Sequence, residues 1–387
     1  MSASACLAAH ATHPDAGMAL ALAAAQIDAQ AAQRPGWRPT LGLLYLSEGF
    51  AERAAECLDE ARRRWPGVAW AGAAAWGLAA DGVEYLDEPA LVLWLIDLPV
   101  AQFRCFDGRH PLADDWAGSA LVHADPELPE LGALLNELAE RTRSGYLFGG
   151  LPSARLHRRH WAGGEPMQGG LSGVAFAPSV GLVSRVTQGC QPVGPTRRVT
   201  GAERNLVATL DGQPALPQLL QDLQVSLDEP RQAMAALRHT LVGLTDEGDA
   251  ARGPGGQFGG DTRVRHLIGI DPLREAVAVA DQVEPGMSLA FCTRDPVAAR
   301  RDLVRICAEI RDEVDGDGSA PPRRILGAHY VSCTGRGGPH FGGDSEELRI
   351  LRHALGEVPL VGFFAAGEIA HRHLYGYTGV LTVFTSA

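Results

Sequence analysis

The chain has 387 residues, of which 46% are hydrophobic and 21% charged, and its formal net charge is −12. This composition is that of a globular rather than a disordered protein, and the length predicts two domains. All 34 basic residues are arginines, and the acidic balance argues against nucleic acid as a partner. Without a lysine, a P-loop and Schiff-base chemistry are excluded.

Cysteine usage and the N-terminal segment predict the compartment. Seven cysteines are scattered without a CxxC pair, which argues against a disulfide framework or a zinc site and favours a reducing cytoplasm. The alanine-rich stretch 16–32 lacks the basic start of a signal peptide, so residues 1–34 are expected to form an N-terminal helix. No apolar run approaches the ~20 residues of a membrane span, so no membrane insertion is expected.

A pattern of strand, amphipathic helix and strand recurs four times along the chain. The first copy begins with LGLLYLS (41–47) and ends with VAWAGAAAWG (68–77), and the second runs from 119–127 to 145–150. The third begins at 287–296 and shares its second strand, 325–337, with the fourth, which ends with VPLVGFFAAGEI (358–369). The likeness of the first and last of these endings indicates two similar halves.

Antiparallel strands are expected between these helical units. Segments 171–176 and 180–188 predict a β-hairpin around Ala177-Pro178-Ser179, and segments 91–98, 263–270 and 379–385 also have the composition of strands. We therefore predict an α/β fold, with two related domains of mixed sheets packed with helices and internal strand–helix–strand repeats.

Three segments resemble a known family. They are GCQPVGPTRRVTGAERNLVATLDGQPAL (189–216), VSCTGRGGPHFGGDSEEL (331–348), and VPLVGFFAAGEI (358–369) followed by LYGYTGVLTVF (374–384). Over nearly its whole length the chain resembles the FIST proteins (F-box and intracellular signal transduction). The resemblance implies a FIST N-terminal domain over residues 35–200 and a FIST C-terminal domain over residues 201–387.

The family resemblance also implies a function. The resemblance implies a bacterial-type sensory module that binds small ligands and signals to kinases, methyl-accepting proteins or cyclic-dinucleotide enzymes. One branch resembles a haem-based nitric-oxide sensor that works with a histidine kinase. No kinase, cyclase or F-box segment is recognised beside the two halves, so we expect signalling to a partner in trans.

Two strand ends carry the candidate ligand site. The glycine-rich turn from Cys333 to Gly338 lets a ligand approach the backbone, and Arg336 can form two hydrogen bonds with a carboxylate. Gly367-Glu368 closes an apolar strand, so this carboxylate is expected to meet a ligand amine or Arg336. The ligand-binding residues predicted here are Cys333, Arg336, Gly337, Phe341, Gly367 and Glu368. The alternative is a structural ion pair or a surface loop.

His371 and His373 are the candidate axial ligands of a non-covalent haem b, because a neutral imidazole binds haem iron and no CxxCH motif is present. His329, Cys333 and His340 match no zinc spacing, so no metal site is expected. Catalytic motifs are also lacking, so we expect a protein that is not an enzyme.

The sequence thus favours a stand-alone cytoplasmic sensor of an amino acid, an organic acid or a haem-bound gas. The alternatives are an enzyme that uses Cys333 or Glu368 on a small substrate, and an interaction scaffold without a ligand.

Overall fold

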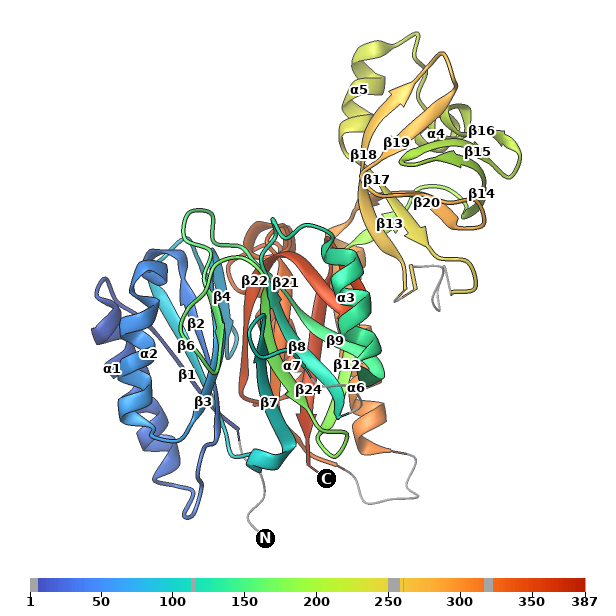
Figure 1. Ribbon diagram of the computed structural model, residues 1–387. Helices are drawn as coiled ribbons and strands as arrows, with labels where there is room; N and C mark the ends of the chain where they lie inside the picture. Colours follow the sequence, from blue (N-terminus) through green and yellow to red (C-terminus); the bar gives the residue numbers. More distant parts are fainter. Residues whose placement is uncertain (1–5, 113–115, 250–257, 260, 317–322, 387) are drawn as a thin grey trace. The chain divides into compact units, whose positions relative to one another are not determined.

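The computed structural model describes residues 6–112, 116–249, 258–259, 261–316 and 323–386 (Figure 1). The chain divides into two compact units, the first made of Met1–Thr187 with Arg300–Ala387 and the second of Gln188–Ala299. The domain limits expected at residues 34/35 and 200/201 do not coincide with the limits of these units. None of the helices within the described ranges is both long and apolar enough to cross a bilayer.

The first unit begins with a five-stranded sheet. In spatial order its strands are β1 (Cys6–Thr12), β6 (Ala90–Ile96), β2 (Leu41–Ser47), β3 (Ala69–Ala75) and β10 (His160–Ala162). Helices α1 (Ala16–Ala31) and α2 (Ala54–Arg64), the latter preceded by the 3-10 helix η1 (Glu48–Arg53), cover one face of it (Figure 1). Because side chains alternate along a strand, Leu44 and Leu46 pack against these helices whereas Leu43 and Tyr45 face the second sheet.

The second sheet of this unit has eleven strands. The main path is β12 (Gly181–Thr187), β24 (Gly379–Thr385), β21 (Ile325–Cys333), β22 (Leu360–His371), β9 (Thr142–Pro152), β8 (Ala117–Ala124), β11 (Leu171–Phe176) and β7 (Phe103–Asp107), which follows η2 (Val100–Gln102). Off this path lie β4 (Gly77–Ala80), β5 (Val83–Leu86) and β23 (His373–Tyr375). Its helices are α3 (Leu131–Glu140), α6 (Pro296–Asp315) and α7 (Glu346–Leu355), with the short η4 (Gly338–Phe341) before α7.

The two sheets of the first unit pack face to face between helices. Leu121 and Phe148 of the second sheet share a core with the first sheet, whereas Val122 and Leu147 pack with Leu135 of α3 on the opposite face. The unit is therefore layered helix, sheet, sheet, helix, which confirms the predicted α/β class.

Three of the predicted strand–helix–strand copies form parallel strand pairs: β2 with β3, β8 with β9, and β21 with β22. The remaining copy does not, because β20 (Ser288–Arg294) pairs within the second unit whereas β21 lies in the first. The predicted hairpin of β11 and β12 is wrong as well. β11 pairs with β7 and β8, and β12 pairs with β24.

The resemblance between the endings VAWAGAAAWG and VPLVGFFAAGE has a structural cause. Gly72 lies opposite Leu44 in the first parallel pair, and Gly362 lies opposite Tyr330 in the last. A Cβ atom at Gly72 would lie 1.8 Å from the Leu44 carbonyl oxygen, and one at Gly362 would lie 1.7 Å from that of Tyr330. Both pairs therefore need glycine at the same point of the second strand.

The N-terminal segment expected to be helical also contains strand β1, which the sequence analysis missed. β1 lies at the edge of its sheet, and an exposed edge offers unpaired backbone groups. Side chains of α1 bond to this edge. Gln26 Nε2 donates to the His10 carbonyl at 2.8 Å and Gln30 Nε2 to the Ala8 carbonyl at 2.7 Å.

The second unit is a closed ring of strands. In order these are β20, β14 (Arg197–Glu203), β15 (Leu206–Leu210), β19 (Ala276–Val279), β18 (Arg263–Asp271) and β17 (Thr240–Thr245), and β17 pairs back to β20. Short strands β13 (Cys190–Pro192) and β16 (Gln213–Pro214) add to its edges, and helices α4 (Ala215–Leu223) and α5 (Pro230–Arg238) pack on its core. Closure leaves few free strand edges in the ring.

Candidate functional site

The predicted ligand-binding residues lie at the ends of two neighbouring parallel strands. β21 ends at Cys333, the chain turns through Arg336 and Gly337 into η4 and α7, and it returns as β22, which carries Gly367 and Glu368. A parallel crossover brings both strand ends to the same edge of the sheet. The structure therefore brings together the residues that the sequence analysis singled out.

Arg336 forms a buried ion pair with Glu347 of α7. The guanidinium Nε lies 2.8 Å from Glu347 Oε1, and the two side chains are 1% and 0% exposed. The same carboxylate accepts hydrogen bonds from the Tyr330 hydroxyl at 2.7 Å and the Ser332 hydroxyl at 2.8 Å. These bonds offset the desolvation of the buried pair, and both oxygens of Glu347 have hydrogen-bond partners.

Glu347 is one residue of this cluster that the sequence analysis missed. A signal was present, because Tyr330 and Ser332 lie two residues apart on β21 and therefore share the face on which α7 packs. Arg336 forms a structural ion pair, which was the alternative to ligand binding. Its partner is Glu347 rather than Glu368.

Glu368 is buried beside this pair. Its Oε2 accepts hydrogen bonds from the Thr378 backbone N–H at 3.1 Å and the Thr378 hydroxyl at 2.7 Å. Burial raises the pKa of Glu368 to about 8, although the Thr378 hydrogen bonds and the charge of Arg336 act in the opposite direction. The carboxyl is thus largely protonated at neutral pH.

Arg336 and Glu368 converge on one short segment before β24. Arg336 Nη1 donates to the Tyr377 carbonyl at 3.4 Å, next to the Thr378 groups that hold Glu368. Among the described residues, Arg336 Nη2 and Glu368 Oε1 have no hydrogen-bond partner. An unpaired guanidinium nitrogen and an unpaired carboxyl oxygen therefore lie within the same buried cluster.

Packing explains the other predicted residues of this cluster. The Arg336 guanidinium lies 5.1 Å from the centre of the Phe341 ring. A Cβ at Gly337 would lie 2.6 Å from the Phe364 ring, and one at Gly367 would lie 2.9 Å from Leu374. Packing against the Phe364 ring thus requires Gly337, whereas a Cβ at Gly367 would displace the end of the Leu374 side chain.

Cys333 has the environment of an unreactive thiol. It is 9% exposed, and burial first and the neighbouring Glu368 carboxylate second raise its pKa to about 12. Because the thiolate is the nucleophilic form, this environment disfavours cysteine chemistry at neutral pH.

A second missed residue, Glu84 of β5, joins the cluster from the N-terminal half of the chain. Its Oε2 accepts a hydrogen bond from the Gly338 N–H at 2.8 Å, and its own N–H donates to the Ser345 hydroxyl at 2.9 Å. Burial raises the pKa of Glu84 to about 7. The turn after β21 is thereby fixed by a strand far away in sequence.

A cleft of about 620 Å³ lies elsewhere in the first unit. Its lining residues come from β8, β9, β12, β22, β24, the loop before β12, and α6. Three hydroxyl groups form a row along it: Tyr146 donates to Ser184 at 2.8 Å, and Ser184 lies 2.7 Å from the Thr382 hydroxyl. Burial raises the pKa of Tyr146 to about 12, so its hydroxyl stays protonated.

Charged and apolar side chains share the same cleft. Arg143, Arg185 and Glu313 line it together with Phe148 and Leu182. Arg185 Nη2 lies 2.7 Å from Glu313 and its Nε lies 3.3 Å from Glu309, both on α6. His371, the last residue of β22, also lines the cleft, and its ring stands edge-on to Tyr146 at a centroid distance of 4.5 Å.

Family models match the chain almost from end to end. The FIST N domain model matches residues 40–213 and the FIST C domain model matches residues 215–371. The chain belongs to the FIST family. An uncharacterized protein of Mycobacterium tuberculosis is 30% identical over 391 residues, which cover 96% of this chain and 97% of the relative. An uncharacterized protein of Mycobacterium bovis is 30% identical over 401 residues, with the same coverage.

FIST domains are associated with signal transduction and the sensing of small ligands. Arg336, Glu347 and Glu368 lie within the FIST C match, whereas Glu84 lies in the FIST N match and Thr378 follows both. The cleft likewise takes side chains from both FIST matches and from the strand that follows them. The family is not a known enzyme family. The relatives' names state no ligand and no partner.

The two histidines predicted as haem ligands differ in position. His371 reaches the cleft of this FIST protein, whereas His373 lies on β23 beside Tyr375. In the cleft, the His371 imidazole, the apolar Phe148 and the arginines are the side-chain types that hold a non-covalent haem through its iron, macrocycle and propionates. The described residues contain no group of three or more His, Cys, Asp and Glu side chains that could hold a metal ion.

His329 lies away from Cys333, in the core between the two sheets. Its Nε2 lies 2.6 Å from the Tyr45 hydroxyl, which also lies 3.0 Å from Nε2 of His123. Burial lowers the pKa of His329 to about 3, so the imidazole is neutral. This FIST protein thus joins its two sheets through an uncharged polar network.

Proposed function

We propose that this FIST protein is a cytoplasmic sensor that binds a small carboxylic acid, such as an amino or organic acid, in the cleft beside Tyr146 and His371. The carrying observation is the cleft itself. Its volume of about 620 Å³ falls in the range of small-molecule sites, about 300–1,000 Å³.

The lining side chains favour a ligand with one acidic and one hydrogen-bonding part. Arg185 binds the carboxylates of Glu309 and Glu313, and this supports recognition of a ligand carboxylate by the same guanidinium. A ligand carboxylate can exchange with Glu313, which also lines the cleft. The hydroxyl row of Tyr146, Ser184 and Thr382 offers further donors and acceptors.

The same contacts suggest how occupancy is transmitted. Glu309 and Glu313 lie on α6, which begins at Pro296 in the second unit and continues in the first. A ligand that takes Arg185 from these residues removes two ion pairs from α6. We propose that the freed helix face alters binding to a histidine kinase or another signalling protein in trans.

Thermal unfolding with a panel of amino and organic acids tests this function. A ligand at 100 times its Kd adds about 2.7 kcal/mol to the free energy of unfolding, and the midpoint temperature rises accordingly. Arg143→Gln should reduce the rise, whereas Arg63→Gln, an exposed arginine paired with Glu60, should not. If no acid in the panel shifts the midpoint, or if both variants respond like the natural chain, the ligand assignment is wrong and the scaffold alternative gains support.

Haem is a second candidate for the same cleft. When bound, haem would supply an iron that takes a diatomic gas, and His371, Arg143 and Arg185 are the residues that would hold it. Absorption spectra with and without added haemin test this proposal. His371→Ala should abolish a Soret band that His373→Ala leaves intact; equal spectra for both variants would overturn the assignment.

The predicted contact of a ligand with Cys333, Arg336, Gly337, Phe341, Gly367 and Glu368 remains a separate proposal. Its support is the unpaired Arg336 Nη2 and Glu368 Oε1 within one buried cluster. Glu368→Gln tests this proposal, because the variant keeps the shape of the site but replaces the carboxyl group, including its unpaired oxygen, with an amide. Loss of the ligand-induced midpoint shift in Glu368→Gln, with retention in Arg143→Gln, would place the ligand here rather than in the cleft.

A further inference from the structure

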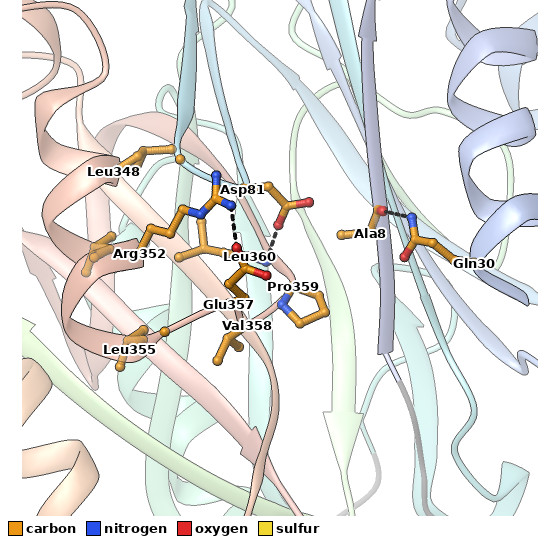
Figure 2. Close-up of a pocket in the computed structure, with 13 residues that line it drawn as sticks. Ala8, Gln30, Asp81, Leu348, Arg352, Leu355, Glu357, Val358, Pro359 and Leu360 are labelled. Carbon is orange, nitrogen blue, oxygen red and sulfur yellow. Dashed lines mark hydrogen bonds and ion pairs between the residues drawn. The ribbon is translucent and has the colours of Figure 1, made fainter. Parts of the chain in front are cut away.

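A smaller cavity, separate from the cleft, lies between α7 with the start of β22 and the edge strand β1 (Figure 2). Its volume is about 220 Å³. One wall is apolar and is made of Leu348, Leu351, Leu355, Val358, Pro359 and Leu360. An engineered cavity of about 150 Å³ with such a lining binds benzene, so a cavity of this size accommodates a small organic molecule.

The polar feature of this cavity is the Asp81 carboxylate. Its backbone N–H donates to the Leu360 carbonyl at 2.9 Å, and its Oδ1 accepts from the Leu360 N–H at 2.8 Å. These two bonds fix the side chain, which stands in a left-handed turn at φ 42°. The other carboxylate oxygen is directed across the cavity toward Ala8 (Figure 2).

The charge around Asp81 is unbalanced. Within the described ranges Asp81 forms no ion pair, because the nearby Arg352 binds Glu357 through a contact of 2.8 Å. The other titratable neighbour is His10, which bonds to Tyr85 and whose pKa is lowered by burial, so it is neutral at pH 7. Burial raises the pKa of Asp81, and this effect outweighs the opposing effects of the Leu360 N–H bond and of the nearby His10 and Arg352.

We propose that this cavity binds a primary ammonium ion carrying a short aliphatic chain. The ammonium group donates to the free oxygen of Asp81, and the chain lies along the leucine wall of α7 and β22. The volume limits the chain to about four to six carbons. Neutral analogues of the same shape bind less well, because they leave the desolvated carboxylate without a charged donor.

Titration calorimetry of the full-length protein with n-butylammonium chloride tests the proposal, and n-butanol serves as the neutral analogue. The expected result is saturable binding of butylammonium that is at least about tenfold tighter than that of butanol. In the series from methylammonium to decylammonium, affinity should rise to a maximum near about four to six carbons and then fall.

Asp81→Asn locates the site, because asparagine keeps an oxygen for the Leu360 N–H but removes the charge. This variant should weaken butylammonium binding by about tenfold or more. Glu140→Gln removes the same charge from an exposed position on α3. In this variant the affinity for butylammonium should change by less than about twofold. Equal binding by butanol, or unchanged binding in Asp81→Asn, would overturn the proposal. If Asp81→Asn does not fold, a chain-length series without an optimum overturns it instead.

Discussion

Four buried polar side chains meet in the cluster after β21, and their charge states differ. Arg336 and Glu347 form an ion pair, whereas burial raises the pKa of Glu84 to about 7 and that of Glu368 to about 8. A single buried arginine cannot neutralise three carboxylates, so protons compensate the excess negative charge. The cluster therefore stabilises the fold, and its carboxyl groups Glu84 and Glu368 titrate near neutral pH.

Glu347→Gln removes one partner of the buried ion pair and leaves the Arg336 charge without compensation. We expect the free energy of unfolding to fall by about 3–5 kcal/mol. Arg349→Gln, which breaks the exposed pair with Glu346, should change it by less than about 1 kcal/mol. Urea denaturation of the two variants checks this. Equal losses in the free energy of unfolding would show that the buried pair of Glu347 stabilises the fold no more than the exposed pair does.

Glu368→Gln tests the proton bound by Glu368. The folded pKa of about 8 lies above the ordinary value of 4.5, so the stabilising contribution is complete below pH 4.5 and is lost as the pH rises through 8. Over that window the group lowers the free energy of unfolding of the natural chain by up to about 1.4 kcal/mol per pH unit.

Glutamine stays neutral, so stability should fall less steeply from pH 5 to 8 in Glu368→Gln than in the natural chain. Glu140→Gln provides the control of equal charge change on the surface. Identical slopes in the natural chain and in Glu368→Gln would contradict the raised pKa.

At the scale of elements, the parallel pairs depend on close approach of their backbones. Gly362→Ala places a Cβ 1.7 Å from the Tyr330 carbonyl oxygen, and neither backbone can move without breaking the β21–β22 ladder. We expect a loss of at least about 3 kcal/mol or failure to fold. Gly132→Ala in α3, where nothing lies within 4 Å, should instead stabilise the helix by up to about 1 kcal/mol. Thermal denaturation of both variants checks the contrast.

Helices and strands with a clear periodicity of apolar residues could be predicted from the sequence, whereas the pairing of the strands could not. The apolar run at β2 and the amphipathic α2 were identified because burial on one or two faces produces their pattern directly. Strand β1 was missed because seven residues rich in alanine resemble the start of the helix that follows. The β11–β12 hairpin failed for a related reason: a Pro-Ser turn looks the same whether its strands pair with each other or with distant ones.

The candidate site shows the same limit. Cys333, Arg336 and Glu368 could be grouped in advance because they sit at the ends of strands in one crossover. Glu84 and Tyr146 could not, because only the folded chain brings them beside Gly338 and Ser184. Contacts between residues far apart in sequence leave no local pattern.

At the scale of the whole molecule, the chain leaves the first unit after Thr187 and returns to it at Arg300. The intervening segment closes its own ring of strands, from β14 to β20, around its own core. It also holds a nearly buried two-bond ion pair, with Arg197 donating to Asp222 at 2.6 and 2.7 Å. A segment with a closed hydrogen-bond network and a separate core meets the requirements of an independent folding unit.

We therefore expect residues 188–299, expressed alone, to fold into a soluble domain with a single cooperative unfolding transition. A segment of about 110 residues should unfold with an enthalpy of about 65–90 kcal/mol, measured by calorimetry. Asp222→Asn should lower its midpoint because it leaves the largely buried Arg197 charge unpaired. A segment that aggregates or unfolds without cooperativity would show that the ring needs the first unit, and that the family's two sequence domains, rather than the compact units, are the physical folding units.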